Sequence, residues 1–134
     1  MRRVRITYKR AYHHVMNRGL NGKRIFFDGQ AKNHIIQLMR NLTNKNKIMM
    51  FMYCIIYNHY HIVLQLIENN LSRFIKELNG EYGSYYSKRN GGKSYVFQNR
   101  FKLTLIESDE YLRMAIIYTL LNSVKAGLEI NPMN

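Results

Sequence analysis

CIIYNHYHIVLQL, residues Cys54–Leu66, has the clearest strand pattern in the chain. After Asn58 the residues alternate in character, and side chains on a β-strand point alternately to its two faces. One face of this strand carries the apolar residues Ile62, Leu64 and Leu66. The other face carries His59, His61, Val63 and Gln65. Two histidines are therefore expected side by side, opposite an apolar face.

The pair His59 and His61 can bind one divalent ion, because their imidazoles share a face of the strand. The same pair can also be two polar residues on the open face of a half-buried strand. The metal interpretation requires a third ligand and a nucleophile from elsewhere in the chain. His13 and His14, on an earlier expected strand, are adjacent, so at most one of them can share that face.

The composition indicates one basic domain with a polyanionic partner. At 134 residues, of which 46% are hydrophobic, the chain is expected to form a single domain over residues 1–134. Its 21 Lys+Arg and 8 Asp+Glu give a formal net charge of +13, which favours nucleic acid as the partner over an anionic membrane. Residues 1–9 are expected to form a basic N-terminal arm.

A membrane location fits the sequence poorly. The longest apolar run, residues 48–57, is half of the roughly 20 residues that a spanning helix needs. No apolar signal core follows the basic N-terminus. The single cysteine, Cys54, excludes an internal disulfide and fits a reducing cytoplasm. We expect a cytoplasmic, nucleoid-associated protein with no membrane partner.

The order of the expected elements is that of a ferredoxin-like domain. Strands are expected at residues 10–17, 48–57, 59–67 and 96–106, and helices at 28–42, 71–88 and 108–125. Asn69 or Asn70 is expected to cap the second helix, and Ser108 the third. The order β-α-β-β-α-β, with one added C-terminal helix, indicates an α+β fold with an antiparallel sheet and two helices on one face.

The last helix carries a row of polar groups. At about 100° per residue, Tyr118 faces away from the apolar row of this helix, and Asn122 and Lys125 follow it at one-turn intervals. The apolar row consists of Leu112, Ile116, Leu120 and Val124. Such a helix can cover an open sheet face that bears two histidines. It can also be an ordinary helix with one half-exposed tyrosine.

Four motifs resemble those of the single-tyrosine HUH transposases of bacterial insertion sequences and REP-associated elements. HUH denotes two histidines around a hydrophobic residue. The motifs are YHHVMNRG (12–19), NHYHI (58–62), FQNRFK (97–102) and YTLLNSVKAGL (118–128), in the order that the family has them. The chain departs from the usual family residues at Tyr57, Tyr60 and Ser123.

The resemblance implies cleavage and rejoining of single-stranded DNA, with hairpins at the element ends. It implies that Tyr118 attacks the scissile phosphate to give a 5′-phosphotyrosine bond and a free 3′-hydroxyl. It implies that His59, His61 and Asn122 hold one Mg²⁺ or Mn²⁺. Either Lys125 or a metal-bound water is expected to assist the loss of the phenol proton.

The resemblance also implies partners. A homodimer is expected, in which Tyr118 of one chain can act with the histidines of the other, although some relatives act as monomers. No nucleotide cofactor is expected, because the phosphotyrosine bond retains the energy needed for rejoining. The candidates for phosphate contacts are Arg18, Lys23, Arg24, Arg100 and Lys102.

Other functions remain open from the sequence. The fold also hosts RNA-recognition domains, in which aromatics such as Tyr53, Tyr57 and Tyr60 can stack on bases from the open sheet face. A metal-independent ribonuclease can use His59 or His61 as a base, and it would leave no covalent adduct. A domesticated relative can bind hairpins without cleaving them.

Overall fold

The computed structural model describes residues 9–92, 96–98 and 100–125, and only the backbone of residues 122–125. In chain order the elements are β1 (Tyr12–Arg18), η1 (Leu20–Gly22), α1 (Gly29–Lys45), β2 (Ile48–Ile56), β3 (His59–Leu66), α2 (Leu71–Asn90), β4 (Lys102–Ile106) and α3 (Asp109–Lys125). This order agrees with the expected one. The expected basic arm lies outside the described residues except for Lys9.

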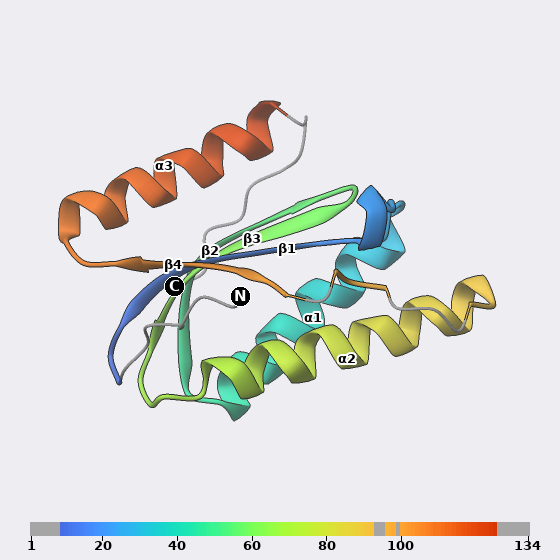
Figure 1. Ribbon diagram of the computed structural model, residues 1–134, viewed down its shortest axis with the longest axis horizontal. Helices are drawn as coiled ribbons and strands as arrows, with labels where there is room; N and C mark the ends of the chain where they lie inside the picture. Colours follow the sequence, from blue (N-terminus) through green and yellow to red (C-terminus); the bar gives the residue numbers. More distant parts are fainter. Residues whose placement is uncertain (1–8, 93–95, 99, 126–134) are drawn as a thin grey trace.

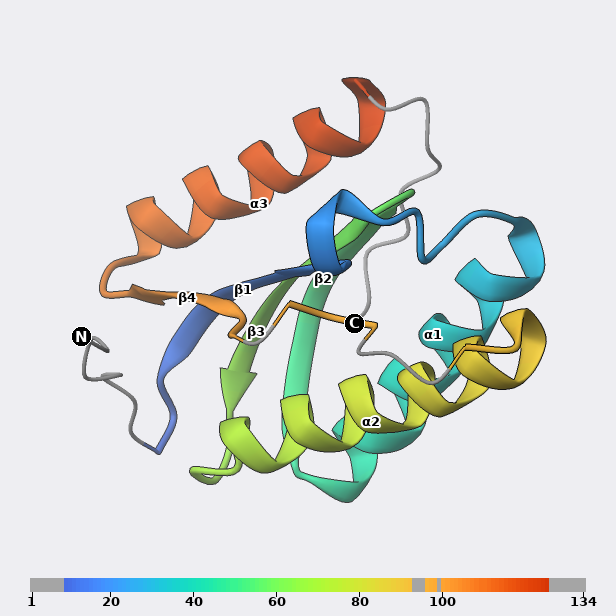
Figure 2. The same cartoon turned by 45° about the vertical axis from the view of Figure 1, so that its right-hand side comes forward.

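The sheet has the strand order β2-β3-β1-β4, and every neighbouring pair is antiparallel. Helices α1 and α2 cover one face, and α3 crosses the other (Figures 1 and 2). The predicted α+β, ferredoxin-like arrangement with an added C-terminal helix is therefore confirmed. The central strands β1 and β3 pair so that Met16 lies opposite His61 and Arg18 opposite His59.

Two cores lie on the two faces of the sheet. Ile62, Leu64 and Leu66 of β3 are fully buried in the larger core, beneath α1 and α2. Val63 belongs to a second, smaller core, which also contains Met52, Ile106 and Ala115. The alternation predicted for residues 59–66 is therefore confirmed. The second core fixes α3 over the face that carries the histidines.

The helix starts follow from capping side chains in two cases. Asp28 Oδ1 accepts a hydrogen bond from the Ala31 amide at 2.8 Å and begins α1. Ser108 Oγ accepts one from the Tyr111 amide at 3.1 Å, as predicted for α3. Asn70 is the N-cap residue of α2, one of the two residues predicted, but it makes no side-chain hydrogen bond to the helix: its side-chain amide donates to the Asn46 carbonyl at 3.2 Å. The Asn70 side chain therefore bonds to a residue that is distant in the sequence and not to the first turn of α2.

The predicted strand over residues 96–106 is too long, because β4 begins only at Lys102. Lys102 pairs with Met16, and Phe97 bridges Gly19. Four residues separate Lys102 from Phe97, but only two separate Met16 from Gly19, so two residues must leave the ladder. Residues 96–98 still bond to the end of β1, since the Gln98 amide donates to the Arg18 carbonyl at 2.9 Å.

Candidate active site

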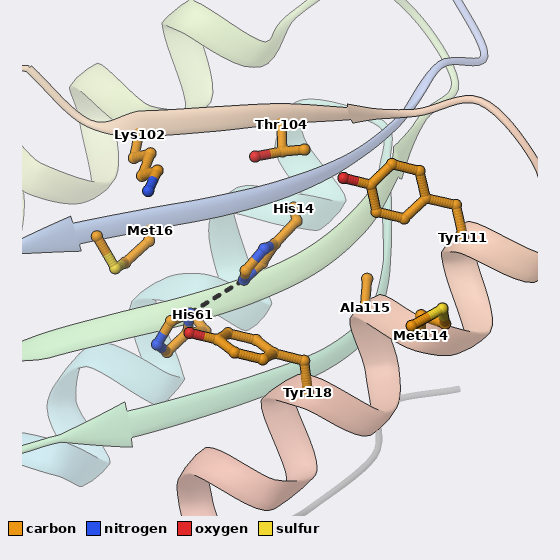
Figure 3. A pocket seen from close by; sticks show the side chains of 9 residues that line it. All are labelled: His14, Met16, His61, Lys102, Thr104, Tyr111, Met114, Ala115 and Tyr118. Atoms are coloured by element: carbon orange, nitrogen blue, oxygen red, sulfur yellow. Dashed lines mark hydrogen bonds between the residues drawn. The ribbon is translucent and has the colours of Figure 1, made fainter.

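A pocket of about 340 Å³ lies between α3 and the face of the sheet opposite α1 and α2 (Figure 3). It is lined by His14, Met16, His61, Lys102, Thr104, Tyr111, Met114, Ala115 and Tyr118. Strands β1, β3 and β4 form its floor, and α3 forms one wall. Of the predicted site residues, the pocket lining includes His61, Tyr118 and Lys102.

A histidine of β1 joins the predicted pair. The His14 Nε2 and His61 Nδ1 atoms are 3.0 Å apart and share a hydrogen bond. The two ring planes are nearly parallel at 15°, with 5.2 Å between centroids, so the rings lie edge to edge along this hydrogen bond. The sequence prediction did not include His14 in the site. Its only signal was the adjacency of His13 and His14, and the choice between them depends on how β1 pairs with β3.

His59 and His61 lie side by side at the start of β3. Their ring centroids are 5.0 Å apart, and the rings are nearly perpendicular at 78°. The His59 Nδ1 is 2.7 Å from Asn58 Oδ1, which accepts its hydrogen bond. The His61 Nε2 is buried and has no hydrogen-bond partner among the described residues. A buried polar atom without a partner is rare in proteins and requires an explanation.

The environment keeps these three histidines neutral at physiological pH. Burial, with the nearby His14 and His59, lowers the pKa of His61 to about 3. Burial and the Lys102 charge lower the pKa of His14, and burial and the Arg18 charge lower that of His59. Neutral imidazole is the form that binds metal ions.

Tyr118 reaches the histidines from α3. Its ring centroid lies 6.0 Å from that of His14 and 6.0 Å from that of His61, edge-on to both. Figure 3 shows the ring extending from α3 toward His61. The Tyr118 side chain is 55% exposed, so a substrate can approach it.

The apolar side of α3 holds the helix on the sheet. Leu112, Ile116 and Leu120 of the predicted row pack against the second core, and Ala115 and Thr119 are buried. The predicted opposition between this row and the exposed Tyr118 is confirmed. The side chains of Asn122, Val124 and Lys125 lie outside the described part of the chain. The α3 backbone includes Asn122, about one turn after Tyr118.

The predicted phosphate contacts lie in three places. Arg18 and Lys102 lie on the site face, as partners of His59 and Met16 in the sheet. Arg100 precedes β4, and its carbonyl accepts a hydrogen bond from the Gln98 side chain at 3.1 Å. Lys23 and Arg24 lie over aromatic rings instead, those of Tyr86 and Tyr57, at 5.6 and 5.2 Å from the ring centroids.

The imidazoles fit a divalent cation. The unpartnered, buried His61 Nε2 has the free lone pair that a ligand needs if its hydrogen is on Nδ1, and His59 lies beside it. No cluster of three or more His, Cys, Asp or Glu side chains suited to a metal occurs among the described residues. A third protein ligand would then be of another type, such as a carboxamide.

No helix in the described part of the chain is long and apolar enough to cross a bilayer. Residues 7–118 match the family model described as "Transposase IS200 like".

Two solved structures show the same fold at low sequence identity. The REP-associated tyrosine transposase bound to a REP hairpin has a TM-score of 0.75 at 16% identity, over 96% of this chain and 76% of that chain. A candidate transposase from Deinococcus radiodurans R1 has a TM-score of 0.61 at 12% identity, over 92% of this chain and 98% of that chain. A comparison with curated proteins gives no match.

Proposed function

This chain belongs to the IS200-like transposase family, and from that premise we propose that it cleaves and rejoins single-stranded DNA with Tyr118 as the nucleophile. The observation that carries the proposal is the approach of Tyr118 to His61, with ring centroids 6.0 Å apart. These residues come from α3 and β3, on opposite sides of one pocket (Figure 3). A half-exposed phenol beside buried imidazoles is a suitable arrangement for nucleophilic attack on a phosphate.

In the proposed reaction the Tyr118 oxygen attacks the scissile phosphorus. A tyrosine–phosphorus bond forms, the bond to the 3′-oxygen breaks, and a 3′-hydroxyl is released. Attack by a second 3′-hydroxyl reverses the step and rejoins the strands. Lys125, seven residues after Tyr118 on α3, is our candidate for assisting the transfer of the phenol proton.

His59, His61 and Asn122 are our candidates for holding one Mg²⁺ or Mn²⁺. When bound, the ion would polarise the phosphate oxygens and stabilise the charge that develops on them. Support comes from the unpartnered Nε2 of His61 and from the position of Asn122 in α3, about one turn after Tyr118. The neutral state of both histidines, which burial favours, leaves lone pairs for coordination.

The DNA substrate is proposed to contain a hairpin. A net charge of +13 favours a polyanion, and the similar REP-associated transposase was solved with a REP hairpin. Arg18 and Lys102 lie on the site face and are proposed to contact the phosphates nearest the cleaved bond. Arg100, Lys23 and Arg24 are proposed to contact the DNA farther along.

A second copy of this chain is the proposed protein partner. Helix α3 exposes Met114, which also lines the pocket, together with Ile117 and Leu121, at 62%, 53% and 62%. These residues lie close together on one side of the helix, and a contiguous exposed apolar surface indicates a protein contact. Sedimentation of the wild type and of Ile117→Lys would test this dimer. A wild-type protein that stays monomeric at high concentration would contradict it.

To test the reaction, the protein is mixed with labelled single-stranded DNA hairpins, with and without Mn²⁺. We expect a denaturation-resistant protein–DNA adduct that needs the metal and is lost in Tyr118→Phe and His61→Ala. Tyr111→Phe is the matched control, because Tyr111 lies on the same helix and lines the same pocket. Hairpin binding without an adduct would favour a binding module. RNA cleavage that survives in Tyr118→Phe would indicate a ribonuclease.

A further inference from the structure

Both histidines of the proposed metal pair have their Nδ1 atoms occupied by a neighbour. His59 Nδ1 bonds to Asn58 Oδ1 at 2.7 Å, and His61 Nδ1 bonds to His14 Nε2 at 3.0 Å. The neighbours come from different places, the turn before β3 and the adjacent strand β1. Only the Nε2 atoms are then left for a ligand.

We propose that His14 and Asn58 are positioning residues that keep the hydrogens of His61 and His59 on Nδ1, so that both Nε2 lone pairs face one divalent cation. This inference rests on the proposed metal-dependent function and adds two residues to it. A metal-binding histidine commonly donates its other ring N–H to a fixed acceptor, which sets the tautomer and the ring orientation.

For His59 the hydrogen position follows directly from the partner. The Asn58 side-chain oxygen can only accept a hydrogen bond, so the His59 Nδ1 must be the donor. With that hydrogen on Nδ1, the lone pair of the neutral imidazole ring is on Nε2.

For His61 two hydrogen arrangements are possible within the 3.0 Å contact. If His14 donated, His61 would carry its hydrogen on Nε2, and that buried N–H would have no acceptor among the described residues. If His61 donates, Nε2 is instead a buried acceptor that a bound cation satisfies. In the second arrangement no buried N–H lacks an acceptor. The site therefore favours this arrangement once the cation binds.

The fold holds His14 firmly in the accepting position. It lies on the central strand β1, paired with Val63 on one side and Thr104 on the other. Its ring lies edge to edge with that of His61, nearly in one plane at an angle of 15°, so the bonded nitrogens point at each other along the hydrogen bond. Because His14 already holds the His61 ring in place, less side-chain ordering is needed when a metal binds.

Two substitutions separate the acceptor from the shape of His14. His14→Phe keeps a planar aromatic ring but removes the accepting nitrogen, whereas His14→Gln restores an acceptor. We expect Mn²⁺ affinity, measured by calorimetry, to fall about 10- to 100-fold in His14→Phe and to recover most of that loss in His14→Gln. His34→Phe is the control, since His34 of α1 stacks on Tyr85 of α2 with ring centroids 3.8 Å apart, and these helices cover the other face of the sheet (Figure 1).

A direct readout of the tautomers makes the inference independent of folding in the variants. The chain has only five histidines, so ¹⁵N signals of the metal-free wild type can be assigned to individual rings. We expect hydrogen on Nδ1 of His59 before metal is added, hydrogen on Nδ1 of both His59 and His61 when Zn²⁺ is bound, and a shift of the Nε2 signals on binding. Hydrogen on Nε2 of His61 with metal present, or coordination through His14, would overturn the inference.

The outcomes also separate this inference from the proposed function. If adduct formation needs His61 and Tyr118 but Mn²⁺ affinity is unchanged in a folded His14→Phe, the positioning role is wrong and the function stands. If the wild type binds no Mn²⁺ and forms no adduct, the proposed function fails, and the positioning role fails with it.

Discussion

Acid should destabilise this protein through His13, the buried neighbour of His14 on β1. His13 is 0% exposed, and burial lowers its pKa from 6.5 to about 4. The unfolded chain therefore binds a proton between pH 6.5 and 4 that the folded chain does not. Because the pKa of His13 is lower in the folded chain, its contribution to the free energy of unfolding is complete above pH 6.5. This contribution is lost as the pH falls toward 4.

The size of the effect follows from the shift. At about 1.36 kcal/mol per pKa unit, a change from 6.5 to about 4 has an upper limit of about 3 kcal/mol, of which about 2 kcal/mol is lost by pH 5. Relaxation of the fold and entry of water on protonation reduce this, so we expect a loss of about 1–2 kcal/mol.

The assay is urea unfolding at pH 7.5 and pH 5.0. We compare the stability lost between the two pH values in the wild type, in His13→Phe and in the control His34→Phe. Because each protein is its own reference, an overall destabilisation by the substitution does not affect the comparison. His13→Phe should lose about 1–2 kcal/mol less than the wild type. Equal losses in these two proteins would refute the assignment of the effect to His13.

Two further predictions concern Gly19, directly after β1, and the phosphate contacts. In Gly19→Ala the new Cβ would lie 2.3 Å from the Lys23 carbonyl oxygen, so thermal unfolding should show a loss of about 1–3 kcal/mol. At Gly80 of α2 a new Cβ would meet no atom within 4 Å, so Gly80→Ala should raise the free energy of unfolding by about 0.5–1 kcal/mol. If Gly80→Ala were instead destabilised as much as Gly19→Ala, the steric explanation would be contradicted. In Lys102→Ala the dependence of log K for hairpin binding on log salt should weaken by about one unit of slope, whereas Lys76→Ala on α2 should leave it unchanged.

Local patterns in the sequence were sufficient for much of the fold. The alternation after Asn58 predicted which side of β3 faces the helices, since the faces of a strand depend only on its own backbone geometry. The predicted cap at Ser108 likewise acts within one turn of the chain. Asn70 is the N-cap residue of α2 as predicted, but its side chain bonds to the carbonyl of Asn46, far away in the sequence, and not to the helix.

The sequence also predicted much of what the pocket contains. Periodicity placed Tyr118 opposite the apolar row of α3, and the second core beneath that row brings the tyrosine to His61. The expected ligand Asn122 and the assisting Lys125 remain predictions, because their side chains lie outside the described residues.

What the tertiary structure alone decided was register. The sequence could not choose between His13 and His14, and pairing of β1 with β3 turned His14 into the pocket and His13 into the helix side. Register between β1 and β4 also shortened the last strand, and packing placed Lys23 and Arg24 on aromatic rings away from the pocket. Periodicity is a property of one segment, whereas register and packing are set by contacts between segments far apart in the chain.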